Sequence, residues 1–404
     1  MLRKFIKRFV PRTHYWRNIG FDELSEIYAS QMLRSLALSL VSIFVPVYLY
    51  TIGYSFRQIL LFFAVWFASR LVTTPFMALI VGRIGPKHSI LLSQILQIVY
   101  LSMLMTLESM NWSIYLLACI GATALGLFWI GFHTDLSKVR HPEHAGKELS
   151  YVNNFERFGA ILGPLIGGLV ANFYDPRYTI FIALIVMVLS SLPLLATKEQ
   201  VLLKQKIRFR GFPYRENIRT SLATAALELD TQSCQIVWPL YVAVAIFGQD
   251  IFGKLGAMAA LSVALGLLFT HAIGRLIDNK RGGELLFYSS IANSVVYLLR
   301  PIVNTTLLVF GINLINDPIT TAMKIPFLKG YHDAADSYEG YRIVFFAVNE
   351  WFTAFVRSLF WLGLFAATYL WPALTVMKWH FAVMAVLVLG ILLQRFPALY
   401  RQKA

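Results

Sequence analysis

Charged residues are scarce in this 404-residue sequence: they make up 14% of it, against about 25% in ordinary soluble domains. Its two cysteines are too few for a disulfide framework, and its histidines form no second ligand cluster that would indicate a metal site. It also lacks the phosphate-binding pattern G-x-x-x-x-G-K-[ST], which argues against ATP hydrolysis by this chain. The composition is therefore neither that of a soluble domain nor that of a disulfide-rich secreted protein.

Apolar residues fill most of the chain. They account for 57% of it, and the mean hydropathy is +0.62. They gather into segments of about 20 residues, the length of a helix that crosses a bilayer. We therefore predict an all-α integral membrane protein with twelve transmembrane helices. The expected ranges are 28–51, 57–81, 88–107, 111–133, 150–173, 177–195, 220–247, 250–275, 284–300, 302–325, 341–369 and 373–393.

The formal net charge of +15 comes from basic residues that lie between the expected spans. They concentrate in alternate connections, which is typical of cytoplasmic loops. We therefore predict a multi-pass protein of the cell membrane with both termini in the cytoplasm, and no nucleic-acid partner. The residues are Arg83, Lys87, Lys138, Arg140, Lys147, Lys198, Lys204, Lys206, Arg208, Arg210, Arg215, Arg275, Lys280, Arg281, Lys324, Lys329, Arg342, Arg395, Arg401 and Lys403.

Several landmarks recur at one offset along the chain. Pro46 and Pro239 are separated by 239 − 46 = 193 residues, and Arg34 and Glu228 by 228 − 34 = 194. Such repeats are common in transporter folds, where the solute site lies between the repeats. We predict two pseudo-symmetric halves of six helices each. The expected segments are a basic N-terminal segment 1–27, a first half 28–195, a basic linker 196–219, a second half 220–393 and a tail 394–404.

Two loops carry the pattern of a known family. The loop after the second helix reads A-L-I-V-G-R-I-G-P-K, in which Arg83, Gly85 and Lys87 match the signature G-x-x-x-D-R-x-G-R-R of the major facilitator superfamily. Gly82 replaces its aspartate. The second half restores the glycine and the aspartate as Gly274 and Asp278. The sequence thus resembles this superfamily over nearly its whole length, which implies two six-helix halves around a central cavity.

The fifth helix contains G-A-I-L-G-P-L-I-G-G, which resembles the antiporter motif of the same superfamily. The residues that match are Gly159, Gly163, Pro164, Gly167 and Gly168. Small residues at this spacing let helices approach closely, so plain helix packing explains the motif as well as exchange transport does.

Charged side chains inside the expected spans are candidate functional residues, because lipid excludes them. They are Arg34, Arg70, Glu156, Arg157, Glu228, Asp230, Asp317, Glu350 and Arg357. Arg34 and Glu228 occupy equivalent places in the two halves. They are expected either to bind solute and exchange partners, or to form a permanent structural pair.

Polar residues share faces with these charges and predict a cavity wall. The expected cavity residues are Gln31, Arg34, Glu228, Gln232, Gln235, Asn313, Asp317 and Glu350. Proton coupling needs a carboxyl whose protonation changes with its surroundings, and the candidates are Glu228 and Asp317. Glu350 and Arg357 share a face of the eleventh expected helix, so Arg357 is expected to neutralise Glu350 within that helix.

The sequence therefore predicts a secondary transporter for a small solute that works by alternating access. Proton-coupled efflux is favoured by the motif on the fifth helix, and uptake remains the alternative. A membrane transferase or a non-transporting scaffold represents the competing classes. We expect no cofactor and no metal, a monomer, and the solute and the lipid bilayer as partners. His133 is expected at the end of a helix, as a solvated histidine.

Overall fold

The computed structural model describes residues 21–139, 145–195, 207–247, 251–278, 281–338, 340–394, 396 and 399. Within these ranges, the side chains of residues 21–28, 135–139, 145–157, 267–268, 270–272, 274–275 and 277–278 lie outside the description. The described chain is helical almost throughout, in agreement with the expected all-α membrane fold.

Six membrane-crossing segments form the first half of the chain. They are α2 (Phe21–Val41) with α3 (Val45–Thr51), α4 (Phe56–Ile84), α5 (Pro86–Met105), α7 (Ile114–Val139), α8 (Ala145–Phe173) and α9 (Pro176–Ser191) with the 3₁₀ turn η2 (Pro193–Leu195). The short helix α6 (Leu107–Met110) connects α5 to α7.

Six further segments form the second half. They are α10 (Tyr214–Gln232) joined to α11 (Trp238–Ala245) by the π-helical η3 (Ser233–Val237), then α12 (Ile251–Asp278), α13 (Gly282–Leu299) with η4 (Arg300–Ile302), α14 (Thr306–Ser337), α15 (Arg342–Ala367) and α16 (Ala373–Leu387) with η5 (Val388–Leu393). The predicted arrangement of twelve spans in two halves of six is confirmed.

The ends of the bundle differ in charge. We call the end with the loops before α5, α10, α13 and α15 the basic end, and the other end the opposite end. Three helices that start at the opposite end, α4, α9 and α14, have side-chain caps there: Ser55 accepts from the backbone N–H of Gln58, Asp175 from that of Arg177 and Thr305 from that of Leu308. Such caps satisfy donors that a helix start leaves unpaired.

Several helix limits differ from the expected ones. Helix α14 continues to Ser337, so Lys324 and Lys329 lie within a helix and not in a connection. Helix α10 starts at Tyr214, inside the segment expected as a linker. Both extensions are polar at the basic end, and hydropathy cannot distinguish a polar helical turn outside the membrane from a loop.

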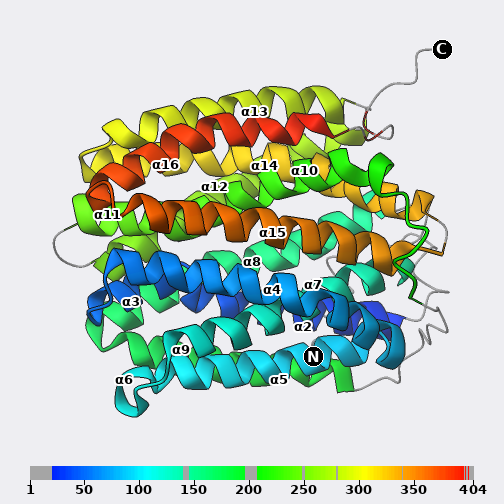
Figure 1. The fold of residues 1–404 in the computed structure, drawn as a ribbon, viewed down its shortest axis with the longest axis horizontal. Coiled ribbons are helices and arrows are strands. Elements are labelled where there is room, and N and C mark those ends of the chain that lie inside the picture. Colours follow the sequence, from blue (N-terminus) through cyan, green and yellow to red (C-terminus); the bar gives the residue numbers. More distant parts are fainter. Residues whose placement is uncertain are drawn as a thin grey trace.

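The halves pack along two helix pairs. Helix α4 of the first half lies beside α15 of the second, and α8 lies beside α12. Figure 1 shows α4 and α15 next to each other across the middle of the bundle, with α13 and α16 on one side and α5 and α9 on the other. The two pairs relate to each other by the repeat, because each joins the second helix of one half to the fifth helix of the other.

Hydropathy separates the helices into two groups. Among the described residues, eight helical segments are long and apolar enough to cross a membrane, and α8 and α12 contain shorter apolar stretches, Phe158–Phe173 and Ile251–Gly266. The segment α10–α11 and helix α14 do not meet this criterion, because they contain the acidic and amide residues of the second half. These two polar segments direct attention to the interior of the second half.

Candidate functional site

Four charged side chains meet near the middle of the bundle. Arg70 Nη2 of α4 lies 2.6 Å from Glu350 Oε1 of α15. Arg357 Nη2, two turns along α15, donates to the same oxygen at 2.8 Å, and its Nη1 donates to Glu228 Oε2 of α10 at 3.1 Å. We call these residues the central charge cluster. It joins the first half to the second through Glu350.

The central charge cluster contains two positive and two negative groups, so its formal charge is balanced. The side chains of Arg70 and Arg357 are 2% and 0% exposed, and Glu350 is 17% exposed. Burial of such charges is tolerated only when they are paired. The Arg357 guanidinium also lies 4.5 Å from the centre of the Phe67 ring of α4, which is a favourable cation–π contact.

Glu228 is the accessible member of the central charge cluster. Its side chain is 37% exposed, while Asp230, two residues along α10, is 3% exposed. Consecutive helical residues differ by about 100° around the axis, so these two carboxyls lie on different faces. Glu228 thus points to the space between the halves and Asp230 into the second half.

Arg34 and Gln31 lie in the first half. The Arg34 guanidinium sits 3.5 Å from the centre of the Phe128 ring of α7, and both Arg34 and Gln31 are buried. Glu228, its symmetry counterpart, pairs with Arg357. The structure therefore brings Glu228 and Glu350 together in one cluster and holds Arg34 against an aromatic ring of its own half.

The polar residues of α14 face the second half. Asn313 accepts a hydrogen bond from the Trp238 indole at 2.9 Å. The backbone carbonyl of Asp317 accepts from Thr321 at 2.7 Å, one turn along. Gln232, at the end of α10, is partly exposed, and Gln235, in η3, is exposed. These four expected cavity residues are thus spread along α10–η3 and α14, outside the central charge cluster.

A second polar cluster fills the interior of the second half. Asp230 Oδ1 accepts from Asn293 Nδ2 at 2.9 Å and from the Tyr297 hydroxyl at 2.8 Å. Arg300, fully buried, donates from Nη2 to Asn316 Oδ1 and to Cys234 Sγ, both at 3.2 Å. Asp230 is a charge inside an expected span and so signals this cluster in the sequence, whereas Arg300 lies at the expected end of the span 284–300 and carries no such signal.

The antiporter-like motif lies on α8 and packs against two helices, α2 and α12. A Cβ atom at Gly159 would lie 2.7 Å from the backbone nitrogen of Leu36, and one at Gly167 would lie 2.5 Å from the carbonyl of Leu40, so this face fits α2. A Cβ atom at Gly163 would likewise overlap the Ser39 side chain of α2. Gly168 and Pro164 face α12, where a Cβ at Gly168 would lie 2.6 Å from the carbonyl of Phe252.

The loop between α4 and α5 has the geometry that its signature requires. Gly85 ends α4 with φ +88°, a conformation that favours glycine, and its N–H donates to the carbonyl of Val81. Arg83 is exposed and Lys87 is buried. A Cβ atom at Gly82 would lie 2.5 Å from Ile207, so the residue that replaces the signature aspartate makes room for the segment before α10. The side chains of Asp278, Glu156 and Arg157, and any substituent at Gly274, lie outside the described residues.

The halves also meet at the basic end. His133 of α7 and His332 of α14 contact through Nδ1 and Nε2 at 3.1 Å, and His332 Nδ1 donates to the carbonyl of Leu328. His133 stacks on Trp129 and Phe346. The expectation of a solvated His133 is therefore wrong, because α7 continues past it and α14 and α15 cover its ring.

Comparisons with known proteins fit this architecture. The sequence model of the Major Facilitator Superfamily matches residues 27–401, nearly the entire described chain. The chain belongs to the major facilitator superfamily. As a superfamily member with a duplicated six-helix half, it is a multi-pass membrane protein and a secondary transporter.

Relatives of this superfamily member include proteins named for drug resistance. Multidrug resistance protein MdtG of Enterobacter lignolyticus (strain SCF1) is 26% identical over 294 residues, which cover 66% of this chain and 67% of MdtG. Quinolone resistance protein NorA of Staphylococcus aureus (strain MSSA476) is 27% identical over 253 residues, which cover 57% of this chain and 63% of NorA.

A solved structure shares the fold. The transporter FucP in its outward conformation superposes with a TM-score of 0.67 at 13% identity, over 92% of this chain and 97% of FucP. At this identity the likeness concerns the fold alone.

Proposed function

We propose that this transporter exports amphipathic organic compounds from the cytoplasm in exchange for protons. The observation that carries the proposal is the central charge cluster, in which one carboxylate, Glu350, holds an arginine of each half. Its exposed member, Glu228, offers a negative group to a proton or to a cationic solute. The names of the relatives MdtG and NorA, which refer to drug resistance, support export of such compounds.

Partner exchange within the central charge cluster supplies the coupling. When Glu228 binds a proton or a cation, its attraction for Arg357 falls. Arg357 then interacts more strongly with Glu350 and competes with Arg70 for that carboxylate. The Arg70–Glu350 pair is the contact between the halves at this level, so its weakening favours separation of α4 from α15.

The basic end faces the cytoplasm in this proposal. Lys87, Arg208, Arg210, Arg281 and Arg342 lie at that end, and positive residues are retained on the cytoplasmic side. Both termini are then cytoplasmic and the protein resides in the cell membrane. All four residues of the central charge cluster come from one chain, so a monomer suffices.

The test is flux in sealed proteoliposomes, with ethidium and a quinolone as separate probes. We expect an imposed pH gradient to drive accumulation of at least one probe, and Glu228→Gln to abolish the dependence on the gradient. Glu284→Gln is the matched control, because Glu284 forms an exposed pair with Arg281 on α13. The proposal fails if flux of both probes ignores the gradient, or if both variants behave alike.

A further inference from the structure

The cluster inside the second half holds a carboxyl that the proposed exchange does not use. Asp230 is 3% exposed, and among the described residues no cation lies within ion-pair distance of it. Two neutral groups, the Asn293 amide and the Tyr297 hydroxyl, both donate hydrogen bonds to Asp230 Oδ1. An ionised carboxyl buried in this way is costly, whereas the neutral acid accepts both hydrogen bonds on Oδ1 and leaves Oδ2 to hold a proton.

The neighbours of Asp230 form a chain of hydrogen bonds with one direction. Arg300 Nη2 can only donate, so Cys234 Sγ accepts from it at 3.2 Å. The Tyr297 hydroxyl donates to Asp230 Oδ1 and therefore accepts from the Cys234 thiol, 3.7 Å away. The chain of hydrogen bonds leads from Arg300, which follows the end of α13, to Asp230 near the end of α10.

The fold does not require this cluster, because the first half manages without it. Arg300 is the residue that caps the end of α13, and the corresponding cap of α5 is Thr106. By the offsets of 193 and 194, Asp230 corresponds to Ala37 and Leu36 on α2. His380 is the eighth residue of α16, and the eighth residue of α9 is Ala183. The same scaffold thus packs with small or uncharged residues at these places.

The local backbone supports a functional role. The π-helical segment η3, which carries Cys234, interrupts the α-helical hydrogen bonding between α10 and α11 beside Asp230. Such π-helical turns are frequent at functional sites. Two nitrogens of the buried Arg300, Nε and Nη1, have no hydrogen-bond partner. Aromatic rings cover this guanidinium instead, with Tyr297 at 4.3 Å and Trp238 at 5.0 Å.

We propose that Asp230 is a second proton-binding site, enclosed in the second half, with Arg300 as the nearby cation that compensates its charge once the proton has left. This inference rests on proton exchange as the proposed function. In the structure described, the carboxyl holds its proton on Oδ2. When Oδ2 loses this proton to water, Asp230 becomes an anion, and the hydrogen bonds from Asn293 and Tyr297 and the positive charge of Arg300 stabilise it.

Other groups face this site from every packed element and belong in its electrostatics. They are Tyr297 on α13, Arg300 on η4, Lys324 on α14, Cys234 on η3 and, beside Arg300, His380 on α16. His380 contacts Ser233, next to Cys234, through Nε2 at 2.9 Å. The positive charges of Arg300 and Lys324 favour the anion of Asp230.

The test is infrared difference spectroscopy of the full-length protein in lipid, recorded without substrate while the buffer changes from acidic to alkaline. We expect a C=O stretching band of a protonated carboxylic acid that is absent from Asp230→Asn. Tyr297→Phe keeps the ring and the carboxyl but removes one hydrogen bond to Oδ1, so the band should move to higher frequency. Asp336→Asn, in the partly exposed pair with Arg342, is the matched control and should leave the band unchanged.

Each outcome decides the matter independently of transport. A band that persists in Asp230→Asn, or one that keeps its frequency in Tyr297→Phe, overturns the proposal, and the second variant serves if the first does not fold. Glu228→Gln should retain the band. A protein that shows the band but no pH-driven flux would contradict the proposed function and leave the Asp230 site standing.

Discussion

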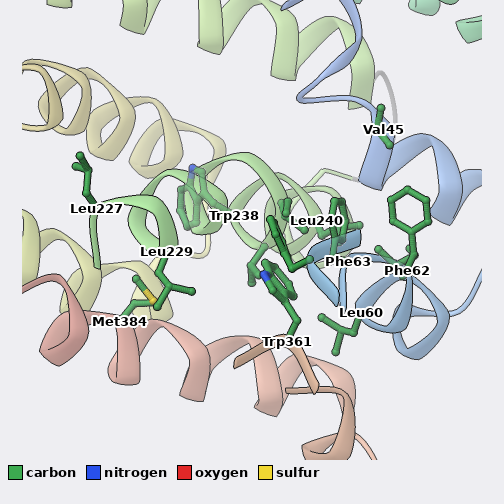
Figure 2. Close-up of a cluster of buried hydrophobic side chains, with 14 of the residues drawn as sticks. Val45, Leu60, Phe62, Phe63, Leu227, Leu229, Trp238, Leu240, Trp361 and Met384 are labelled. Atoms are coloured by element: carbon green, nitrogen blue, oxygen red, sulfur yellow. The ribbon is translucent and has the colours of Figure 1, made fainter. Parts of the chain in front are cut away.

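The two pairs of helices that join the halves use different chemistry. At α8 and α12, backbone lies against backbone: Gly168 and Gly256 face each other, and a Cβ atom at either would overlap the other helix. At α4 and α15, side chains make the contact. Arg70 pairs with Glu350, and the Trp351 indole donates to the carbonyl of Leu71. Phe63 packs on Trp361, and Figure 2 shows both of these side chains in the cluster of buried hydrophobic residues.

The difference separates two mechanical roles. The glycine contact between α8 and α12 involves backbone atoms only, so it contains no side chain that could change its partner. An ion pair with a third charged neighbour does have an alternative, since Glu350 binds Arg357 as well as Arg70. In the proposed exchange, a change of protonation therefore acts on α4 and α15, while the glycine contact keeps the halves together.

We expect the largest effect on stability and on transport at the Arg70–Glu350 pair. Glu350→Gln removes the carboxylate that two buried arginines share, and breaking a buried pair in this way costs about 3–5 kcal/mol. We expect a clear fall in the melting temperature of the purified protein and loss of gradient-driven flux. Arg70→Met combined with Glu350→Gln should recover part of the lost stability, because one buried positive charge is removed with it. No recovery in the double variant would show that the two residues act separately.

A smaller effect is expected at the glycine contact. Gly168→Ala places a methyl group 2.6 Å from the carbonyl of Phe252, and overpacking of this kind costs about 1–3 kcal/mol. The matched control is Gly363→Ala on α15, where nothing lies within 4 Å of the added atom. Thermal unfolding should distinguish the two variants. Equal melting temperatures would mean that α8 and α12 are not held by close contact.

The smallest effect is expected at the edge of the ionic interface. Trp351→Phe keeps an aromatic ring and removes the hydrogen bond to Leu71, which is worth about 1 kcal/mol. The Trp351 side chain is 47% exposed, so little packing is lost with the indole nitrogen. We expect flux close to that of the unaltered protein and a slight fall in melting temperature. A complete loss of transport in this variant would place the switch at Trp351 and not at Glu350.

Hydropathy and repeat spacing were sufficient to predict the twelve spans and the two halves, because lipid imposes length and composition on each span. They were not sufficient for the limits of α10 and α14, whose polar turns continue beyond the apolar stretch. The choice of charge partners was also out of reach. Glu228, Glu350, Arg70 and Arg357 could each be recognised as charges inside a membrane, but the rotation of α4 against α15 decides which of them touch.

Arg300 shows a different limit of sequence reasoning. It stands where an apolar stretch gives way to Pro301, so it reads as an interfacial residue with access to water. In the fold, the Trp238, Tyr297 and Phe381 rings surround its guanidinium. These three aromatic residues come from three separate helical segments, so no local sequence pattern predicts that they surround Arg300.

Gly82 has a consequence for protein engineering. An alignment to the superfamily would mark it as a defect in the signature and suggest aspartate as the repair. Here the space next to Gly82 is taken by Ile207, just ahead of the helix that begins the second half. A consensus-guided substitution at this position would therefore require the Ile207 side chain to move, so the consensus residue cannot be introduced here without a change in its neighbour.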